Sequence, residues 1–210
     1  MDIAVNLVEN YLRLNGYLTL SEFEVQQRNK RGAWETVTDI DIVAIRFPGP
    51  LFAGDAHRDD DCRFLLIEDD GLLLEDGRID VIIGEVKQGE AVFNPGLKSH
   101  AALHTILQRF QSLYESALGD VIHDLQIGGV SHADASGGGS IRTRLVAFGR
   151  SPGLDANTIS LSHMIETVYG YMRRNGEMLQ GAQFKEPAPA LLHLLMKTGF
   201  DVSKLPEPEF

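Results

Sequence analysis

The chain has 210 residues, of which 43% are hydrophobic and 23% are charged, enough apolar sequence for the core of one large domain. No apolar stretch approaches the roughly 20 residues of a membrane helix, the N-terminus does not read as a signal peptide, and Cys62 is the only cysteine, so we expect a cytoplasmic protein that does not interact with membranes. The net charge of −11 argues against simple coating of a nucleic-acid backbone, because phosphates are bound by Lys and Arg.

The first half of the chain is predicted to contain one helix and three strands. Apolar residues recur at helical spacing over residues 3–15. The strands are expected over residues 18–27, 35–47 and 79–88, with a turn between the first two. Residues 48–79 are rich in turn formers, and the window 51–80 carries ten Asp and Glu against three Arg, or −7 of the net charge. We therefore expect an acidic insertion there, folded as a small hairpin that projects from the core.

The second half is predicted to be mainly helical. Its expected elements are a long helix over 98–118, a short helix over 119–128, a flexible loop over 131–140, a strand over 141–149, and helices over 159–175 and 188–198. Basic residues cluster at Arg28/Lys30/Arg31, at Arg142/Arg144/Arg150 and at Arg173/Arg174. The order of elements favours an α/β fold with helices on the faces of a sheet. We expect a core over residues 1–150 and a C-terminal helical extension over 151–210 packed on it.

Two of the predicted strands carry acidic side chains within apolar runs. Side chains alternate faces along a strand, so Glu85 and Lys87 share one face of DVIIGEVKQG. In TDIDIVAI, Asp39 and Asp41 likewise share a face. If the two strands are neighbours, Asp41, Glu85 and Lys87 converge. Two carboxylates on rigid strands suit Mg²⁺ or Mn²⁺, and a lysine beside them can steady a phosphate oxygen, which equips the site to hydrolyse a phosphodiester with a metal-activated water.

This arrangement resembles the PD-(D/E)XK nuclease superfamily, and in particular its Holliday-junction-resolvase-like members. The matching features are Glu9 on the first helix, Gly16-Tyr17 at its exit, DIDIVA at 39–44, and Glu85-Val86-Lys87 after an apolar strand. The resemblance covers about residues 1–117, with a closing strand at 141–149. It implies a restriction-endonuclease-like fold, in which a central mixed sheet is flanked by helices, here with the acidic insertion.

The resemblance also implies a role for each matching residue. Asp41 and Glu85 would be the metal ligands, the carbonyl of Val86 would complete the metal shell, Lys87 would be the catalytic lysine, and Glu9 would contact metal or water. The implied activity is that of a Mg²⁺-dependent endonuclease acting on DNA. Because the chain is acidic, such an enzyme would need a local basic face, a homodimer mate or a partner subunit to bind its substrate.

Other residues could also bind a metal ion. Asp69 and Asp70 in LIEDDG rival Asp41, although Asp-Asp-Gly also suits a turn. His100 and His104 have the spacing of metal ligands on a helix, but no third ligand is evident nearby. Asp41 is preferred because its strand has the stronger pattern of burial on one face.

Two other interpretations of function remain open. The chain could be a catalytically inactive member of the same fold that acts as an interaction module in a nucleic-acid or defence complex, which accounts for its acidity more simply. It could also be a different metal phosphohydrolase that acts on a small phosphoester. A divalent-ion site at Asp41 and Glu85, with Lys87 within hydrogen-bond reach, would favour the nuclease.

Overall fold

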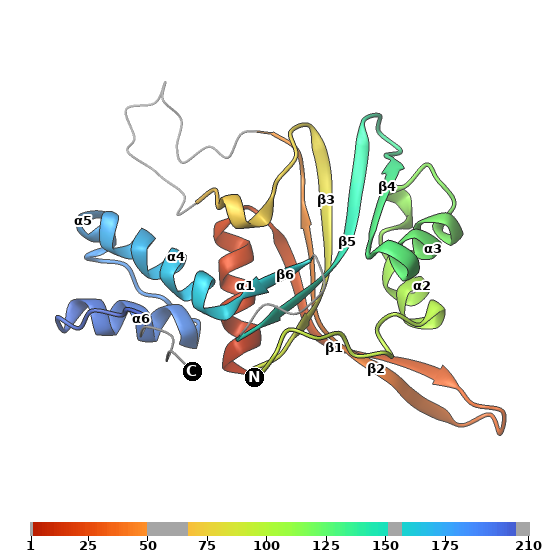
Figure 1. Cartoon of the computed structure of the whole chain (residues 1–210), viewed down its shortest axis with the longest axis horizontal. Coiled ribbons are helices and arrows are strands. Elements are labelled where there is room, and N and C mark those ends of the chain that lie inside the picture. The colour runs from red at the N-terminus through yellow and green to blue at the C-terminus, as the bar shows by residue number, and fades with distance from the viewer. Residues whose placement is uncertain (1, 50–66, 151–156, 205–210) are drawn as a thin grey trace, which may run out of the picture.

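The computed structural model describes residues 2–49, 67–150 and 157–204 as a mixed α/β fold around one six-stranded sheet (Figure 1). The strands are β1 (Leu18–Arg28), β2 (Trp34–Arg46), β3 (Arg78–Val86), β4 (Val130–Asp134), β5 (Ser140–Gly149) and β6 (Thr158–Ser160). Their order is β1-β2-β3-β5-β4, with β6 paired to β5. The pairs β3/β5 and β5/β6 are parallel and the other pairs are antiparallel, so the sheet is mixed.

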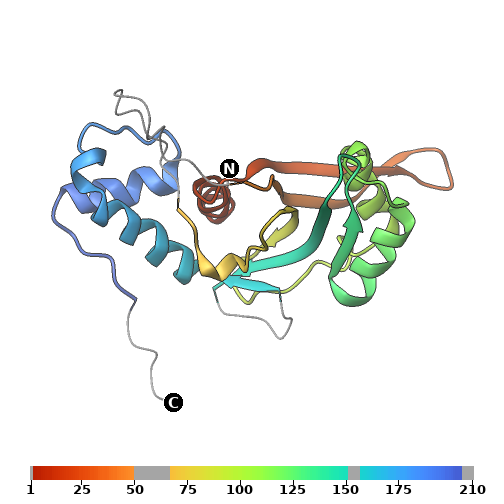
Figure 2. The ribbon, with the colours of Figure 1, turned by 90° about the horizontal axis from the view of Figure 1, so that it is seen from above.

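Helices cover both faces of this sheet. They are α1 (Ile3–Leu14), α2 (His100–Gln108), α3 (Leu118–Gly128), α4 (Leu161–Arg174), α5 (Gly176–Leu179) and α6 (Pro187–Lys197), with short 3-10 helices η1 (Asp70–Leu72) and η2 (Gln111–Leu113). Figures 1 and 2 show α1, α4 and α6 on one side and α2 and α3 on the other. Within the described ranges no helix is long and apolar enough to cross a membrane.

The two faces of the sheet have separate apolar cores, and β3 contributes to both. Ile82 and Val86 pack with α1, α4 and α6, whereas Val81 and Ile83 pack with α2 and α3. A strand that is covered on both faces is apolar almost throughout, which explains the continuous hydrophobic run before Glu85. Gly84 interrupts this run because a Cβ at that position would lie 2.5 Å from Cγ2 of Ile42.

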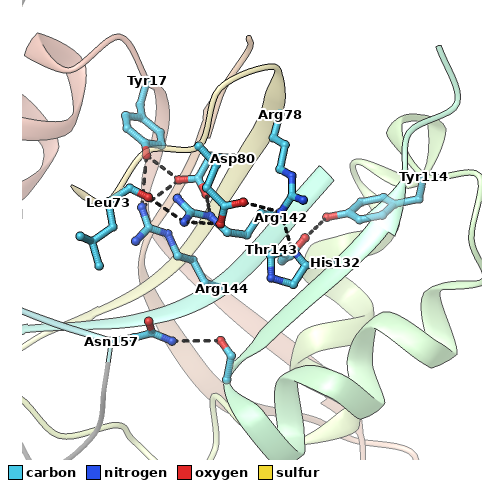
Figure 3. A network of polar contacts seen from close by, with 12 residues as sticks. Tyr17, Leu73, Arg78, Asp80, Tyr114, His132, Arg142, Thr143, Arg144 and Asn157 are labelled. Carbon is cyan, nitrogen blue, oxygen red and sulfur yellow. Dashed lines mark hydrogen bonds and ion pairs between the residues drawn. The ribbon is translucent and has the colours of Figure 1, made fainter. Parts of the chain in front are cut away.

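A buried ion-pair network lies on the α1 side of the sheet (Figure 3). The carboxylate of Asp80 accepts hydrogen bonds from Arg142 Nε at 2.6 Å and from Arg144 Nη2 at 2.9 Å. The Tyr17 hydroxyl donates to the same carboxylate at 2.5 Å, and burial together with the charge of Asp80 raises the pKa of Tyr17 well above its usual range. Arg142 and Arg144 are therefore internal structural cations and do not form a basic surface.

The long helix predicted over 98–118 is wrong in its second half, because α2 ends at Gln108. Beyond it the chain meets the turn between β4 and β5, where Tyr114 forms an isolated bridge with Ala135. The Tyr114 hydroxyl also lies 2.7 Å from Oγ1 of Thr143 in β5. These long-range contacts hold Tyr114 in an extended conformation directly after η2, so one helix cannot continue through this residue.

Two other predicted boundaries are also wrong. The segment 131–140, predicted as a loop, holds most of β4, which pairs with β5 along its length. The helix predicted over 159–175 starts later, at Leu161, because Thr158–Ser160 form β6 and the Ser160 hydroxyl caps the helix. Of the insertion predicted as a hairpin, residues 50–66 lie outside the described ranges, and residues 67–77 contain η1 and no strand.

Candidate functional site

The candidate site lies where β2 and β3 separate. Their antiparallel pairing ends at Ile42 opposite Gly84, one residue before Asp41 and Glu85 would face each other. Beyond that point the Asp41 side chain replaces the backbone partner, because its Oδ2 accepts a hydrogen bond from the N–H of Val86 at 2.7 Å. The end of the strand pair thus holds the Asp41 carboxylate beside the Glu85 residue of the neighbouring strand.

Glu85 and Lys87 form an ion pair in which the acid is buried and the amine is accessible. The Glu85 side chain is 3% exposed, and its Oε1 contacts Lys87 Nζ. The second oxygen, Oε2, is buried and finds no hydrogen-bond partner in the described part of the chain. The Lys87 side chain is 41% exposed, so its ammonium can reach a ligand in solvent.

Burial raises the pKa values of both carboxyl groups above their ordinary range. For Asp41 the charges of Asp39 and Asp2 add to the effect of burial, against the opposing charge of Lys87. For Glu85 the contact with Lys87 opposes burial and the charge of Asp41 adds to it. Burial alone would lower the pKa of Lys87, but the hydrogen bond and charge of Glu85 outweigh it, so its pKa is raised and it remains a cation at neutral pH.

The donor set fits a hard divalent cation. Asp41 and Glu85 supply carboxylate oxygens, and the unpartnered Oε2 of Glu85 is a buried acceptor that a cation would satisfy. Among the residues that the structure describes, no group of three or more His, Cys, Asp and Glu side chains is arranged to hold a metal. Two carboxylates suffice for Mg²⁺, which commonly keeps several waters and binds one or two carboxylates together with substrate phosphates.

Asp2 is a neighbour of the site that the sequence did not reveal, and it contacts Gln88, the residue after Lys87. Asp2 caps α1 by accepting from the N–H of Ala4 at 2.7 Å, and Gln88 Nε2 donates to its two oxygens at 3.2 and 3.3 Å. This contact ties the start of α1 to the segment that follows Lys87. The only signal in the sequence was an Asp immediately before an apolar helix, which is typical of any helix cap.

Glu9 lies elsewhere on α1. Its carboxylate accepts hydrogen bonds from Arg13 Nη2 at 2.6 Å and from the hydroxyls of Thr19 and Ser21 at 3.2 Å. A helix rises 1.5 Å per residue, so Glu9 is about 10 Å along α1 from Asp2. Within the described residues, none of its hydrogen bonds or ion pairs reaches Asp41 or Glu85.

The rival metal ligands have other partners. Asp69 Oδ2 accepts a hydrogen bond from the Tyr11 hydroxyl at 2.7 Å and lies 2.7 Å from His163 Nε2. The Asp69 carboxylate thus joins Tyr11 of α1 to His163 of α4. Asp70 forms the first residue of η1, in agreement with the turn expected from Asp-Asp-Gly. The rings of His100 and His104 stack with centroids 5.9 Å apart on α2. None of the four belongs to a metal-binding group within the described ranges.

Comparisons with known proteins do not assign a family or a function to this chain. No protein-family model matches the sequence, and no curated protein or solved structure matches it either. The chemistry of the site therefore has to be inferred from the side chains themselves.

Proposed function

We propose that the chain is a Mg²⁺-dependent nuclease that hydrolyses DNA phosphodiester bonds on a restriction-endonuclease-like fold. The observation that carries the proposal is the placement of Asp41 beside Glu85 and Lys87 at the separating ends of β2 and β3. The order of α1, three antiparallel strands, α2 and α3, and then β5 parallel to β3 supports the same fold.

Each of the three side chains has a distinct task in this proposal. Asp41 and Glu85 hold the cation, and the carbonyl of Val86 is available as a third oxygen ligand. When bound, Mg²⁺ acts as a Lewis acid for the phosphodiester and offsets the mutual repulsion of the two carboxylates. Lys87 donates a hydrogen bond from its ammonium to a phosphate oxygen, where negative charge grows in the transition state.

The direct test is cleavage of supercoiled, linear and branched DNA, and of RNA, with Mg²⁺ or Mn²⁺ and with EDTA. Lys87→Ala should lower the cleavage rate roughly 10²- to 10³-fold, the usual loss when one donor to a developing charge is removed. Lys185→Ala is a matched control, because Lys185 is an exposed lysine far along the chain. Equal cleavage by Lys87→Ala and the control would remove Lys87 from the mechanism.

The second candidate is an inactive interaction module of the same fold. It is favoured by one observation, namely that only two carboxylates of the described chain meet at the site, with Lys87 already paired to one of them. A protein that binds DNA, remains folded and cleaves none of these substrates with either metal would establish this alternative.

A further inference from the structure

β1 and β2 continue past the body of the protein as a two-stranded arm, defined here as residues 26–36. Figures 1 and 2 both show it extending away from the sheet beyond α2 and α3. Its root is fixed, because Val25 is 2% exposed and packs in the core on the α2 side. The pairing register shifts between Val25 and Gln26, where the arm begins. The arm is therefore held at a defined place and direction by a packed base.

The arm exposes a set of side chains that contribute little to folding. Arg28, Lys30, Arg31 and Trp34 are all exposed, and Trp34 retains 62% of its accessible surface. The Arg28 guanidinium lies 5.1 Å from the centre of the Trp34 ring. None of the three cations has an ion-pair partner in the described part of the chain. A two-stranded hairpin that buries neither face gains little stability of its own. The exposed Trp and cations of the arm therefore do not serve packing, and they are available to bind a ligand.

We infer that this arm is a binding element for duplex DNA, resting on the proposed nuclease function for the choice of polymer. The arm carries three cations and one acid, Glu35, in a chain whose net charge is −11. Exposed Lys and Arg bind phosphates and release their counterions. The major groove of B-DNA is wide enough to admit a two-stranded β-ribbon. The stacked Trp34 holds the planar Arg28 guanidinium in one orientation, which suits it to a bidentate contact with a phosphate.

The arm also fixes how far from the candidate site this contact falls. β2 leads from Trp34, near the tip, to Asp41 at the site, with one extra residue, Val37, at the register shift. Seven residues at about 3.3 Å each span roughly 23 Å. One nucleotide step along a strand of duplex DNA is about 3.4 Å, so for a duplex that lies along β2 the arm would meet the substrate up to about seven base pairs from the phosphate held at Asp41 and Glu85. A duplex that extends less than that on the arm side should lose the contact.

The native protein carries its own probe, because Trp34 is the only tryptophan in the sequence. Titration of unmodified protein in EDTA with a duplex about 20 base pairs long, enough to cover the site and the arm, should quench or shift its emission. The duplex carries a fluorescent label, so that anisotropy measures binding in the same samples. Unchanged Trp34 emission with saturated anisotropy would overturn the proposal without relying on any variant.

The arm variant is R28A/K30A/R31A, and its matched control is R173A/R174A/K185A, which removes the same charge from exposed residues near the other end of the molecule. Three phosphate contacts contribute about 2.7 to the slope of log affinity against log salt, so from 50 to 200 mM salt the wild type should lose about 40-fold more affinity than the arm variant. The control should keep the wild-type slope. An arm variant with the wild-type affinity and slope would refute the inference.

The readouts separate the arm from the catalytic proposal. If Lys87→Ala binds DNA with the same change in Trp34 emission as the wild type but no longer cleaves it, both the nuclease and the DNA-binding arm are supported. Wild-type protein that binds through the arm and never cleaves supports the arm and refutes the nuclease. If the wild type cleaves DNA, and R28A/K30A/R31A binds DNA with the affinity and salt slope of the wild type, the nuclease is supported and the role of the arm is refuted.

Discussion

Two aspartates of the central sheet should respond differently when their charge is removed. Asp80 is 5% exposed at its side chain and receives Arg142 at 2.6 Å and Arg144 at 2.9 Å. Removal of one partner from a buried ion pair typically costs 3–5 kcal/mol, because it leaves a buried charge uncompensated. Asp80→Asn should therefore lower the free energy of unfolding by about 3–5 kcal/mol, and the melting temperature by roughly 6–20 °C for a chain of this size.

Asp41→Asn should leave stability unchanged or raise it by up to about 2 kcal/mol, the usual range when a functional-site constraint is relieved. The amide oxygen can still accept from the N–H of Val86, while the charge that burial and Asp39 disfavour is gone. Thermal and urea unfolding at neutral pH in EDTA measure both variants against the wild type. If Asp41→Asn destabilises the protein as much as Asp80→Asn, then Asp41 is a structural acid and is not reserved for a cation.

Three further predictions concern the metal, the packing of the site strand and acid stability. Mg²⁺ at ten times its dissociation constant should stabilise the wild type by about 1.4 kcal/mol in melting experiments, and should not stabilise Glu85→Gln. Gly84→Ala should cost about 1–3 kcal/mol in urea unfolding, because its Cβ would overlap Ile42 and Phe148. Burial would raise the pKa of Asp69, but hydrogen bonds from Tyr11, the Gly71 N–H and His163 outweigh it, so the pKa is lowered. The stability from Asp69 is thus present above its unfolded pKa of 3.8 and lost as the pH falls below it, so Asp69→Asn should show a shallower loss between pH 5 and about pH 2.

The sequence was sufficient to predict the strands of the candidate site because their signal is local. β3 is apolar until Glu85, and β2 is rich in β-branched residues around Asp41, so both strands and their acids could be located. The sequence could not show that the Asp41 side chain bonds the backbone of Val86. That contact depends on where two paired strands separate, which is a property of the folded sheet.

The elements that were predicted wrongly are those defined by distant partners. β4 lies in a segment rich in Ser and Gly and is a strand because β5 pairs with it. The end of α2 is set by the contact of Tyr114 with Ala135, 21 positions further along the chain. Asp2 reaches the site only because Gln88, after β3, lies beside the start of α1. Periodicity in one window carries no information about such pairs.

The acidic net charge does not exclude the proposed nucleic-acid substrate, because the arm groups three exposed cations that have no ion-pair partner among the described residues. In the other two basic clusters of the sequence, Arg142 and Arg144 pair with Asp80, and Arg173 pairs with Asp201 at 3.0 Å, which leaves Arg150 and Arg174 as the remaining exposed cations of those clusters. Within the described residues, the arm is the basic cluster that lacks acidic partners. An acidic body with a cationic arm would repel DNA from most directions and would admit it along that arm. Since β2 joins the arm to Asp41, the same charge distribution that weakens binding overall would orient the substrate toward the candidate site, and affinity should fall steeply with salt while orientation is preserved.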